Sequence, residues 1–211
     1  MLAEAEAAGL EFELVAVREG DEFNARSKQH VTLTPGVFRA VSQTVTPQGV
    51  IAIARVREPD AQAAIDAARS RRWPLVVLDG VQDPGNVGAI CRTAAAAGAP
   101  AVAVLQGSAD PFSAKAVRAS AGNVFRLTVA RATWAELADL DGYGASASGG
   151  QPLAEAPIEN AGMIVLGSEV HGLSRSDLKL VTVHLSEGVE SLNVAAAAAL
   201  ILFEIKRRLA A

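Results

Sequence analysis

Short apolar runs alternate with helix-like segments from Trp73 to the end of the chain, and this alternation restricts the fold more than any other feature. The runs PLVVLDG (74–80), AVAVLQG (101–107) and GMIVLGSE (162–169) are almost wholly apolar, as strands buried on both faces are. Between them, segments 86–99 and 111–122 have helical composition and contain or end in glycine. The alternation predicts an α/β fold, with a mostly parallel sheet and helices on both faces.

Less apolar segments continue the same pattern. The stretch TWAELADL (133–140) predicts a short helix capped by Thr133. The stretches 124–130, 143–148 and 180–185 predict three further strands, and the apolar run 194–205 predicts a long buried helix.

The first part of the chain is less regular. FELVAVREG (12–20) predicts a strand and GVIAIARV (49–56) predicts a buried one, with proline and glycine punctuating the residues between them. A linker and a short helix follow, for which Asp60 is the expected N-cap. The expected organisation is an N-terminal section, a linking helix and a larger domain, at residues 1–56, 57–72 and 73–211.

Composition excludes several protein classes. The net charge of −4 argues against binding nucleic acid by bulk charge alone, although the chain has local basic clusters such as Arg69, Arg71 and Arg72. No apolar run is long enough to span a membrane, and the N-terminus lacks the basic start of a signal peptide. A single cysteine, Cys91, forms no internal disulfide, so we expect a cytoplasmic protein. Three scattered histidines and this cysteine lack the spacing of metal ligands, so no metal is expected.

Common catalytic motifs are missing. The loop GVQDPGNVG has glycines at 80, 85 and 88, which does not match the spacing of a dinucleotide-binding fingerprint. The chain contains neither a phosphate-binding P-loop motif nor the G-x-S-x-G of the α/β-hydrolases.

Polar residues remain in loops that follow predicted strands, where α/β sheets bind ligands. Asn86 opens a helix and is expected to be its N-cap. Arg92 lies on that otherwise apolar helix, where a packed arginine needs an acidic or phosphate partner. Glu169 stands between two glycines, and Ser191 and Asn193 precede the C-terminal helix.

Three segments together resemble the motifs of the SpoU/TrmH-type RNA ribose 2′-O-methyltransferases, which belong to the SPOUT class. They are DPGNVGAICRTAAAAGA (83–99), VLGSEVHGLS (165–174) and VHLSEGVESLNVAAAAALILFEIKRR (183–208). Their order, their spacing and the patterns N-x-G-x-x-x-R, G-x-E-x-x-G and S-L-N-V agree with that family. One departure is Ala195, where relatives usually carry serine.

The resemblance implies a deep trefoil knot near the C-terminus, bound S-adenosylmethionine and a homodimer. Residues 1–56 resemble part of an L30e-like substrate-binding domain. Carried over by position, the catalytic residues are Arg92, Asn86, Glu169, Ser191 and Asn193. The cofactor-binding residues are Leu166, Gly167, Val183, Leu185 and Leu192, and the RNA-binding residues are Lys115 and Arg118.

The expected activity is methyl transfer from S-adenosylmethionine to a ribose 2′-hydroxyl of RNA. The L30e-like section favours 23S ribosomal RNA, with a thiostrepton-resistance type methylase as a narrower version of that expectation. The alternatives are methylation of a tRNA ribose, methylation of a base nitrogen, and a catalytically weak RNA-binding or assembly protein of the same fold.

Overall fold

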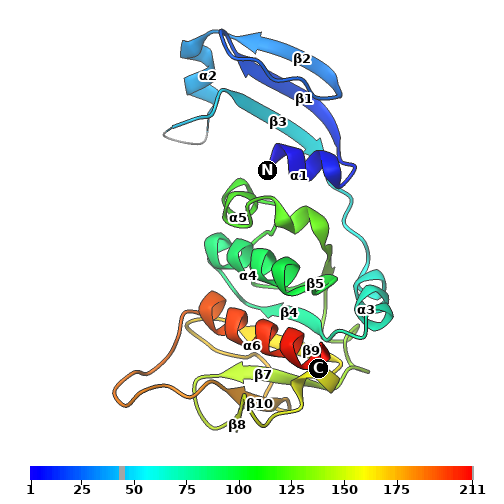
Figure 1. Ribbon diagram of the computed structural model, residues 1–211, viewed down its shortest axis with the longest axis vertical. Coiled ribbons are helices and arrows are strands. Elements are labelled where there is room, and N and C mark those ends of the chain that lie inside the picture. The colour runs from blue at the N-terminus through cyan, green and yellow to red at the C-terminus, as the bar shows by residue number, and fades with distance from the viewer. Residues whose placement is uncertain (43–45, 211) are drawn as a thin grey trace. The chain divides into compact units, whose positions relative to one another are not determined.

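The computed structural model describes residues 1–42 and 46–210, and these form two compact units (Figure 1). The first unit is Met1–Arg57, and the second begins at Glu58. Within the described residues, no helix has the length and apolar character needed to cross a membrane.

The first unit is built on a three-stranded sheet with the order β2-β1-β3. Its strands are β1 (Glu11–Arg18), β2 (Ser27–Leu33) and β3 (Val50–Arg55), and its helices are α1 (Leu2–Ala7) and α2 (Pro35–Val41). Strand β1 is parallel to β2 and antiparallel to β3. The predicted strands at 12–20 and 49–56 are present, but the second is not buried, since Ile53 is 55% exposed. Segment 43–45 lies outside the described residues.

The second unit contains a seven-stranded sheet with the order β6-β5-β4-β9-β7-β10-β8. Every ladder in it is parallel, which confirms the predicted mostly parallel sheet. The strands are β4 (Leu75–Asp79), β5 (Ala101–Leu105), β6 (Thr128–Ala132), β7 (Gly142–Ser146), β8 (Gln151–Pro152), β9 (Met163–Gly167) and β10 (Lys179–Thr182).

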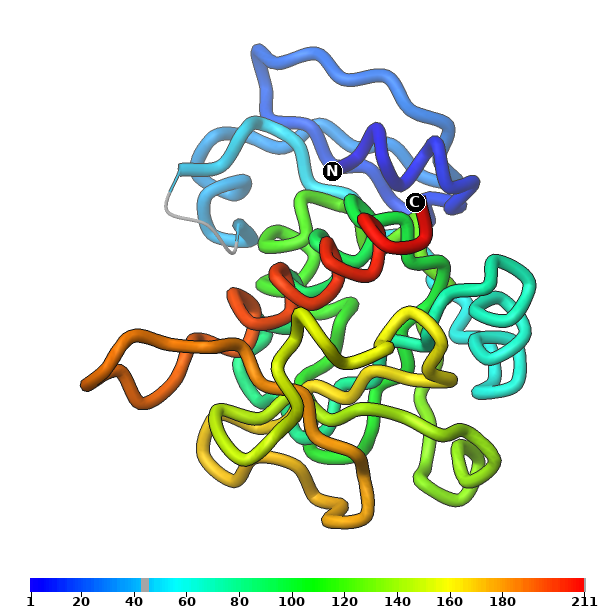
Figure 2. The backbone as a smooth tube through the Cα atoms, turned by 60° about the horizontal axis from the view of Figure 1, so that its bottom comes forward, coloured from blue at the N-terminus to red at the C-terminus, as the bar shows by residue number. Residues whose placement is uncertain are grey.

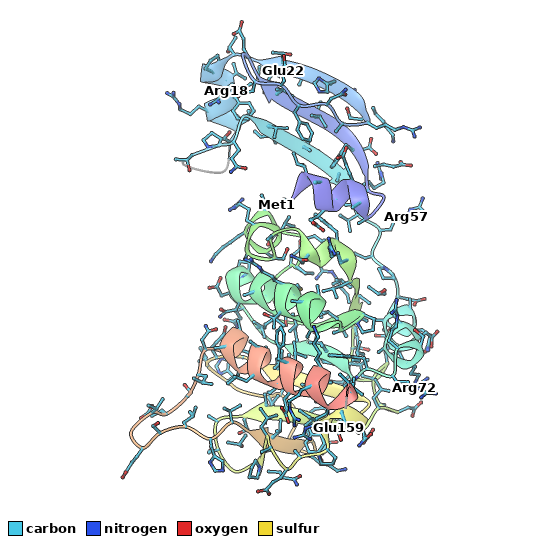
Figure 3. All side chains as sticks on the ribbon, viewed as in Figure 1. Met1, Arg18, Glu22, Arg57, Arg72 and Glu159 are labelled. Carbon is cyan, nitrogen blue, oxygen red and sulfur yellow. The ribbon has the colours of Figure 1, made fainter. Side chains whose placement is uncertain are left out.

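Helices cover both faces of this sheet because successive strand residues point to opposite sides. From β4, Val76 and Leu78 pack with α4 (Pro84–Ala97) and α6 (Val194–Leu209), which lie side by side (Figure 1, Figure 2). Leu75 and Val77 belong to the opposite core, which α3 (Ala61–Ser70) covers. Side chains fill the space between the layers (Figure 3).

Helix α5 (Ala114–Ala119) packs very closely on α4. A Cβ placed on Gly88 of α4 would lie only 2.2 Å from the carbonyl oxygen of Ala116. The glycine of the N-x-G pattern is therefore required by the packing of these two helices.

Two predictions about local structure are wrong. Residues 134–139 form turns instead of a helix, although Thr133 and Glu136 make the reciprocal hydrogen bonds of a helix start. Strand β6 begins only at Thr128, because the 3₁₀ helix Asn123–Arg126 occupies the start of the expected strand. By contrast, Asp60 caps α3 as expected, accepting from the backbone N–H of Ala63 at 2.8 Å.

Strands β4 and β9 are neighbours at the centre of the sheet, and the strands that come next after each of them in sequence, β5 and β10, lie on opposite sides of this pair. From β4 the chain proceeds to β5 and β6 on one side, whereas β7, β10 and β8 lie beyond β9 on the other. In open parallel sheets, ligands bind beyond the carboxyl ends of the strands at such a switch point.

Candidate active site

Three polar side chains from distant parts of the chain form one hydrogen-bonded network beside the switch point. Asn86 donates through Nδ2 to Oε1 of Glu169, 83 residues further along the chain. Asn193 donates through its own Nδ2 to Oδ1 of Asn86 at 3.1 Å, across 107 residues. The structure thus brings together three of the five residues predicted to be catalytic.

Asn86 occupies the first turn of α4 but is not its N-cap, so that prediction is wrong. The N-cap is Asp83, whose Oδ1 accepts from the backbone N–H of Gly85 at 2.8 Å. Because Asp83 performs the capping, both ends of the Asn86 amide are available for Glu169 and Asn193.

Lys115, a predicted RNA ligand, is paired within the protein. Its Nζ donates to Oδ1 of Asp83 at 2.6 Å, and this ion pair is about half exposed. The hydrogen bond from Lys115, together with that from Gly85, lowers the pKa of the Asp83 carboxyl group. Lys115 therefore links α5 to the start of α4, whereas the other predicted RNA ligand, Arg118, is exposed and makes no ion pair within the described chain.

Asn193 uses the two ends of its amide for different purposes. It is the N-cap of α6, since its Oδ1 accepts from the backbone N–H groups of Ala195 at 2.9 Å and Ala196 at 3.4 Å. Its Nδ2 is the group that donates to Asn86. Capping fixes the orientation of the side chain and so points its donor into the network.

Glu169 lies in a tight turn that follows β9. Ser168 and Gly172 exchange two backbone hydrogen bonds of 2.9 Å, and Gly172 has a positive φ of 68°. A Cβ on Gly167 would lie 2.6 Å from the carbonyl of Gly172. Gly167 is therefore needed so that this loop can fold back on the strand that precedes it.

Asp79, which the sequence reading missed, anchors the same loop. This carboxylate ends β4 opposite Gly167, is only 5% exposed, and accepts from the backbone N–H and the hydroxyl of Ser174 at 2.6 and 2.9 Å. The hydroxyl in turn accepts from Nε1 of Trp134 at 2.9 Å. The signal in the sequence was an acidic residue directly after an apolar strand, which is rarely buried without partners.

Arg92 is exposed, so the prediction that it is packed is wrong. The buried face of α4 is formed by Val87, Ile90, Cys91 and Ala94, and position 92 falls on the outer side of the helix. In the part of the chain that the structure describes, its guanidinium makes neither an ion pair nor a hydrogen bond. The group is free to bind an anion from outside. The neighbouring Cys91 is fully buried, and burial raises the pKa of its thiol to about 12.

The remaining predicted residues are not gathered at the network. Ser191 and Leu192 are exposed on segment 183–193, which projects away from the sheet (Figure 1, Figure 2). Val183 and Leu185 are half-buried near the base of this segment, and Leu166 is fully buried in β9. The hydroxyl of Ser191 makes no hydrogen bond with any described residue.

The chemistry available at the network is that of two amides and one carboxylate, and the same helix carries the free cation of Arg92. Residues 1–42 and 46–210 contain no group of three His, Cys, Asp or Glu side chains that could hold a metal ion. Amides and a carboxylate can orient a hydroxyl group by hydrogen bonds, and a free guanidinium suits a phosphate.

Comparison with known proteins is consistent with this arrangement. The family model described as SpoU rRNA Methylase matches residues 74–203. The 23S rRNA (guanosine(2553)-2′-O)-methyltransferase RlmP of Bacillus subtilis strain 168 is 34% identical over 185 residues, which are 82% of this chain and 71% of that protein. Relatives from Mycobacterium are longer, and the chain spans 51% of their length.

Solved structures share the fold over nearly the whole chain. The SpoU methyltransferase AviRb of Streptomyces viridochromogenes, in complex with AdoMet, superposes with a TM-score of 0.87 at 23% identity, covering 99% of this chain and 87% of that one. An AdoMet-bound rRNA methyltransferase of Sinorhizobium meliloti gives a TM-score of 0.82 at 26% identity, covering 99% of this chain and 84% of the other.

Proposed function

This chain belongs to the SpoU rRNA methylase family, and we propose that it transfers a methyl group from S-adenosylmethionine to a ribose 2′-hydroxyl of RNA. The observation that carries this proposal is the network of Asn86, Glu169 and Asn193. Each comes from a different one of the three motifs, and all three meet at the switch point of the sheet.

The proposed substrate is 23S ribosomal RNA. The Bacillus subtilis relative is named for that RNA, and its similarity extends over 82% of this chain. The first unit would contribute to RNA binding as the L30e-like part of the protein. Action on ribosomal RNA would place the protein in the cytoplasm. Methylation of a tRNA ribose is the alternative that the test below distinguishes.

The backbone near the switch point suits a flat cofactor. Gly80 and Gly107, which follow β4 and β5, both have positive φ, and a Cβ on Gly107 would lie 3.6 Å from the Cα of Gly80. At these two positions the edge carries no side chain, so a flat group such as adenosine can approach the backbone closely. The residues proposed to hold S-adenosylmethionine are Leu166, Gly167, Val183, Leu185 and Leu192. The cofactor would supply an electrophilic methyl group on a sulfonium.

The protein's own residues bind and align the ribose. The guanidinium of Arg92 is exposed and makes no ion pair within the described residues, which suits it to binding an anion. We assign it to the phosphate beside the target ribose, where its charge also stabilises the oxygen as its proton leaves to phosphate or water. Glu169 fixes Asn86, and Asn86 and Asn193 orient the ribose, while Ser191 offers a further hydroxyl from segment 183–193.

We also propose that the chain is a knotted homodimer, as the family resemblance implies. The outer face of α6 supports the dimer, because Leu200 and Phe203 are each 47% exposed and lie three residues apart on one side of the helix.

The test is transfer of tritiated methyl groups from S-adenosylmethionine to unmodified transcripts of 23S rRNA and of tRNA. Ribose methylation of the 23S transcript, mapped by mass spectrometry, is the expected result. Labelling confined to tRNA would assign the alternative substrate, and labelling of neither RNA by a chain that binds RNA would indicate the assembly protein.

Arg92→Ala should abolish methyl transfer, a loss of at least about 100-fold, because the charge that binds the phosphate and stabilises the oxygen is removed. Affinity for S-adenosylmethionine, measured by calorimetry, should stay within a few fold. The matched control is Arg131→Ala. It removes an exposed arginine of the edge strand β6, which forms an ion pair with Glu58. Normal methylation by Arg92→Ala would contradict the role given to this residue.

A further inference from the structure

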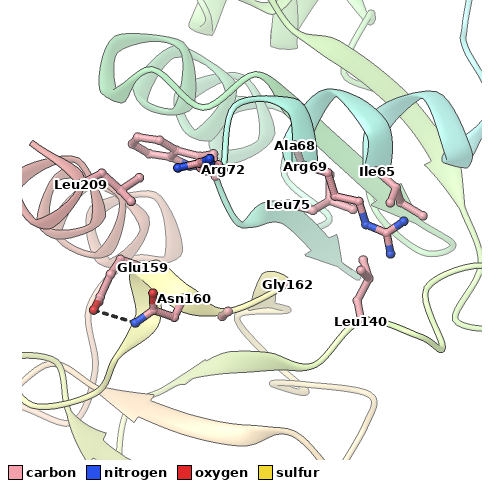
Figure 4. A pocket seen from close by; sticks show the side chains of 12 residues that line it. Ile65, Ala68, Arg69, Arg72, Leu75, Leu140, Glu159, Asn160, Gly162 and Leu209 are labelled. Atoms are coloured by element: carbon pink, nitrogen blue, oxygen red, sulfur yellow. Dashed lines mark hydrogen bonds between the residues drawn. The ribbon is translucent and has the colours of Figure 1, made fainter.

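A pocket of about 360 Å³ opens at the end of the sheet opposite the candidate active site. It is lined by residues at the amino ends of β4 and β9, by α3 and by the last turn of α6 (Figure 4). Strand β4 runs from Leu75 at the pocket to Asp79 at the active-site end, a distance of about 13 Å at 3.3 Å per residue. Nothing in the proposed methyl transfer uses this pocket.

Two unpaired arginines flank the pocket. In Figure 4, Arg72 lies towards Leu209, and Arg69 lies towards Ile65 and Leu140. Both arginines are exposed, and neither makes an ion pair or a side-chain hydrogen bond within residues 1–42 and 46–210.

The acid at the pocket does not neutralise these arginines. Glu159 accepts from Arg208 at 3.0 Å and from Nδ2 of Asn160 at 3.1 Å, so its carboxylate is already used. The two free guanidinium groups therefore give the mouth of the pocket a positive charge that the protein leaves uncompensated.

Arg72 also occupies a backbone position that favours glycine. Arg71 is the C-cap of α3, and Arg72 follows with a positive φ of 53°. The N–H groups of Arg72 and Trp73 donate to the carbonyls of Arg69 and Ala68, each at 3.0 Å, which is the helix ending where glycine is most frequent. An arginine here lowers stability and gains no contact within the described chain, a combination expected at functional sites.

The walls suit a flat, partly apolar ring. The half-buried Leu140 and the exposed Leu209 supply apolar surface beside the buried Ile65 and Leu75, and the Oδ1 of Asn160 is an acceptor without a partner among the described residues. The buried Nε1 of Trp73, another lining residue, likewise donates to nothing in the described part of the chain, and a buried donor left unused is rare.

We infer that this pocket binds one unpaired nucleotide of the RNA substrate, with the base against the apolar wall and the flanking phosphates on Arg69 and Arg72. Proteins hold single-stranded RNA by this combination of basic side chains on the backbone and a surface that receives the base. The inference rests on the proposed function, since it takes RNA as the substrate and adds a second contact at the other end of β4.

The first test is binding of an unmodified 23S rRNA transcript by the full chain at several salt concentrations. The double substitution Arg69→Glu and Arg72→Glu should weaken binding at least tenfold and reduce the salt dependence of the affinity. Arg71→Glu is the matched control, because Arg71 is an exposed arginine of the same helix end that does not line the pocket. If Arg71→Glu weakens RNA binding as much per reversed charge as the double substitution does, the attraction of RNA is diffuse and the inference is overturned.

The second test uses the backbone position. Arg72→Gly should raise the melting temperature by about 2 °C, since glycine suits a positive φ, and should still weaken RNA binding several-fold. Ala121→Gly is its control, because Ala121 has the same φ of 53° but carries no charge, so only its stability should rise. Unchanged RNA affinity in Arg72→Gly would overturn the inference.

Failure of the two proposals can be distinguished. A wild-type chain that methylates 23S rRNA, with pocket variants that bind it normally, would overturn the pocket alone. A wild-type chain that neither binds nor methylates RNA would overturn both. Affinity for S-adenosylmethionine, measured in parallel, should be the same in all these variants and shows that the chain is folded.

Discussion

Gly167 is required by the packing of its own loop, a reason that cannot be inferred from its motif. The family resemblance assigns it to the cofactor-binding residues. In the structure, the space of its Cβ is already taken by the backbone of Gly172 and Leu173, at 2.6 to 2.9 Å. The glycine therefore shapes the loop that holds Glu169 before any ligand is bound.

Gly167→Ala should consequently destabilise the protein by about 1–3 kcal/mol, the usual range for overpacking, even without cofactor. Thermal unfolding of the unliganded chain measures this loss. Gly36→Ala is the control, since Gly36 lies in α2 with no atom within 4 Å of its Cβ position, and alanine suits a helix better. Unchanged stability of Gly167→Ala would mean that the glycine serves only the ligand.

At the residue scale, the sequence predicted which residues come together better than it predicted the surroundings of each side chain. Asn86, Glu169 and Asn193 are three of the five residues predicted to be catalytic, and they are in contact. The exposure of Arg92 was not predicted, because apolar neighbours along the sequence do not reveal which side of a helix faces the core. The role of Asp79 depends on Ser174, 95 residues away, and no local pattern contains that pairing.

The start of α6 combines a structural and a chemical role in Asn193, and substitutions can separate them. Asn193→Asp keeps the acceptor that caps Ala195 and Ala196 but replaces the donor to Asn86 with an oxygen. Its melting temperature should stay close to that of the wild type, while methyl transfer falls about tenfold or more.

Asn193→Ala is the comparison, because it removes the cap as well as the donor. It should lose about 1 kcal/mol of stability in addition to activity. Full activity in Asn193→Asp, measured by tritiated methyl transfer, would show that the contact with Asn86 is unnecessary.

The last turn of α6 carries an acid-sensitive cluster. Hydrogen bonds from Arg207 and Arg208, at 2.7 to 2.8 Å, lower the pKa of Glu204 from 4.5 to about 2. Arg208 also donates to the backbone carbonyl of Leu153 at 2.6 Å and to that of Ala156, which ties the helix to the loop before β9.

Because the folded state lowers this pKa, the stabilisation is complete above pH 4.5 and is lost as pH falls towards 2. Melting temperatures of the wild type should therefore decline more steeply across this range than those of Glu204→Gln, which cannot titrate. Parallel curves for the two proteins would exclude this cluster as a source of acid sensitivity.

At the element scale, long and strongly apolar segments were predictable and short mixed ones were not. The runs that became β4, β5 and β9 are buried throughout, apart from the final Gly167, so their composition alone identifies them. Residues 134–139 have helical composition and a capping pair, yet their turns place Leu137 in the core and Trp134 against Ser174. Tertiary packing decided that segment.

For the whole molecule, the exposed apolar side of α6 leads to a prediction about assembly. Phe203→Glu should convert a dimer, with twice the 21.7 kDa mass of one chain, into a monomer, because a charge would be buried at the interface. Light scattering after size exclusion measures the mass. Val41→Glu, at an exposed apolar residue of α2, should leave the mass unchanged. A wild-type mass of one chain would contradict the proposed homodimer.

The fold class followed from the alternation of strands and helices, but the strand order did not. No periodicity predicts that β9 lies between β4 and β7, which creates the switch point. Only the family resemblance indicated which distant segments of the chain meet, and it did so for the three motifs. In the first unit, α1, α2 and β2 were not predicted.

The adjacency of β4 and β9 has a consequence for how the protein is made. Asp79 receives its donors from a residue that the ribosome adds 95 positions later, and long-range parallel pairing is slow to form. In a nascent chain interrupted before β9, the carboxylate of Asp79 would have no hydrogen-bond donor from Ser174, and β4 would lack its neighbour β9. No methylating site can therefore exist until the chain has been made as far as Asn193, and products terminated before that point should be degraded or aggregate instead of acting on RNA.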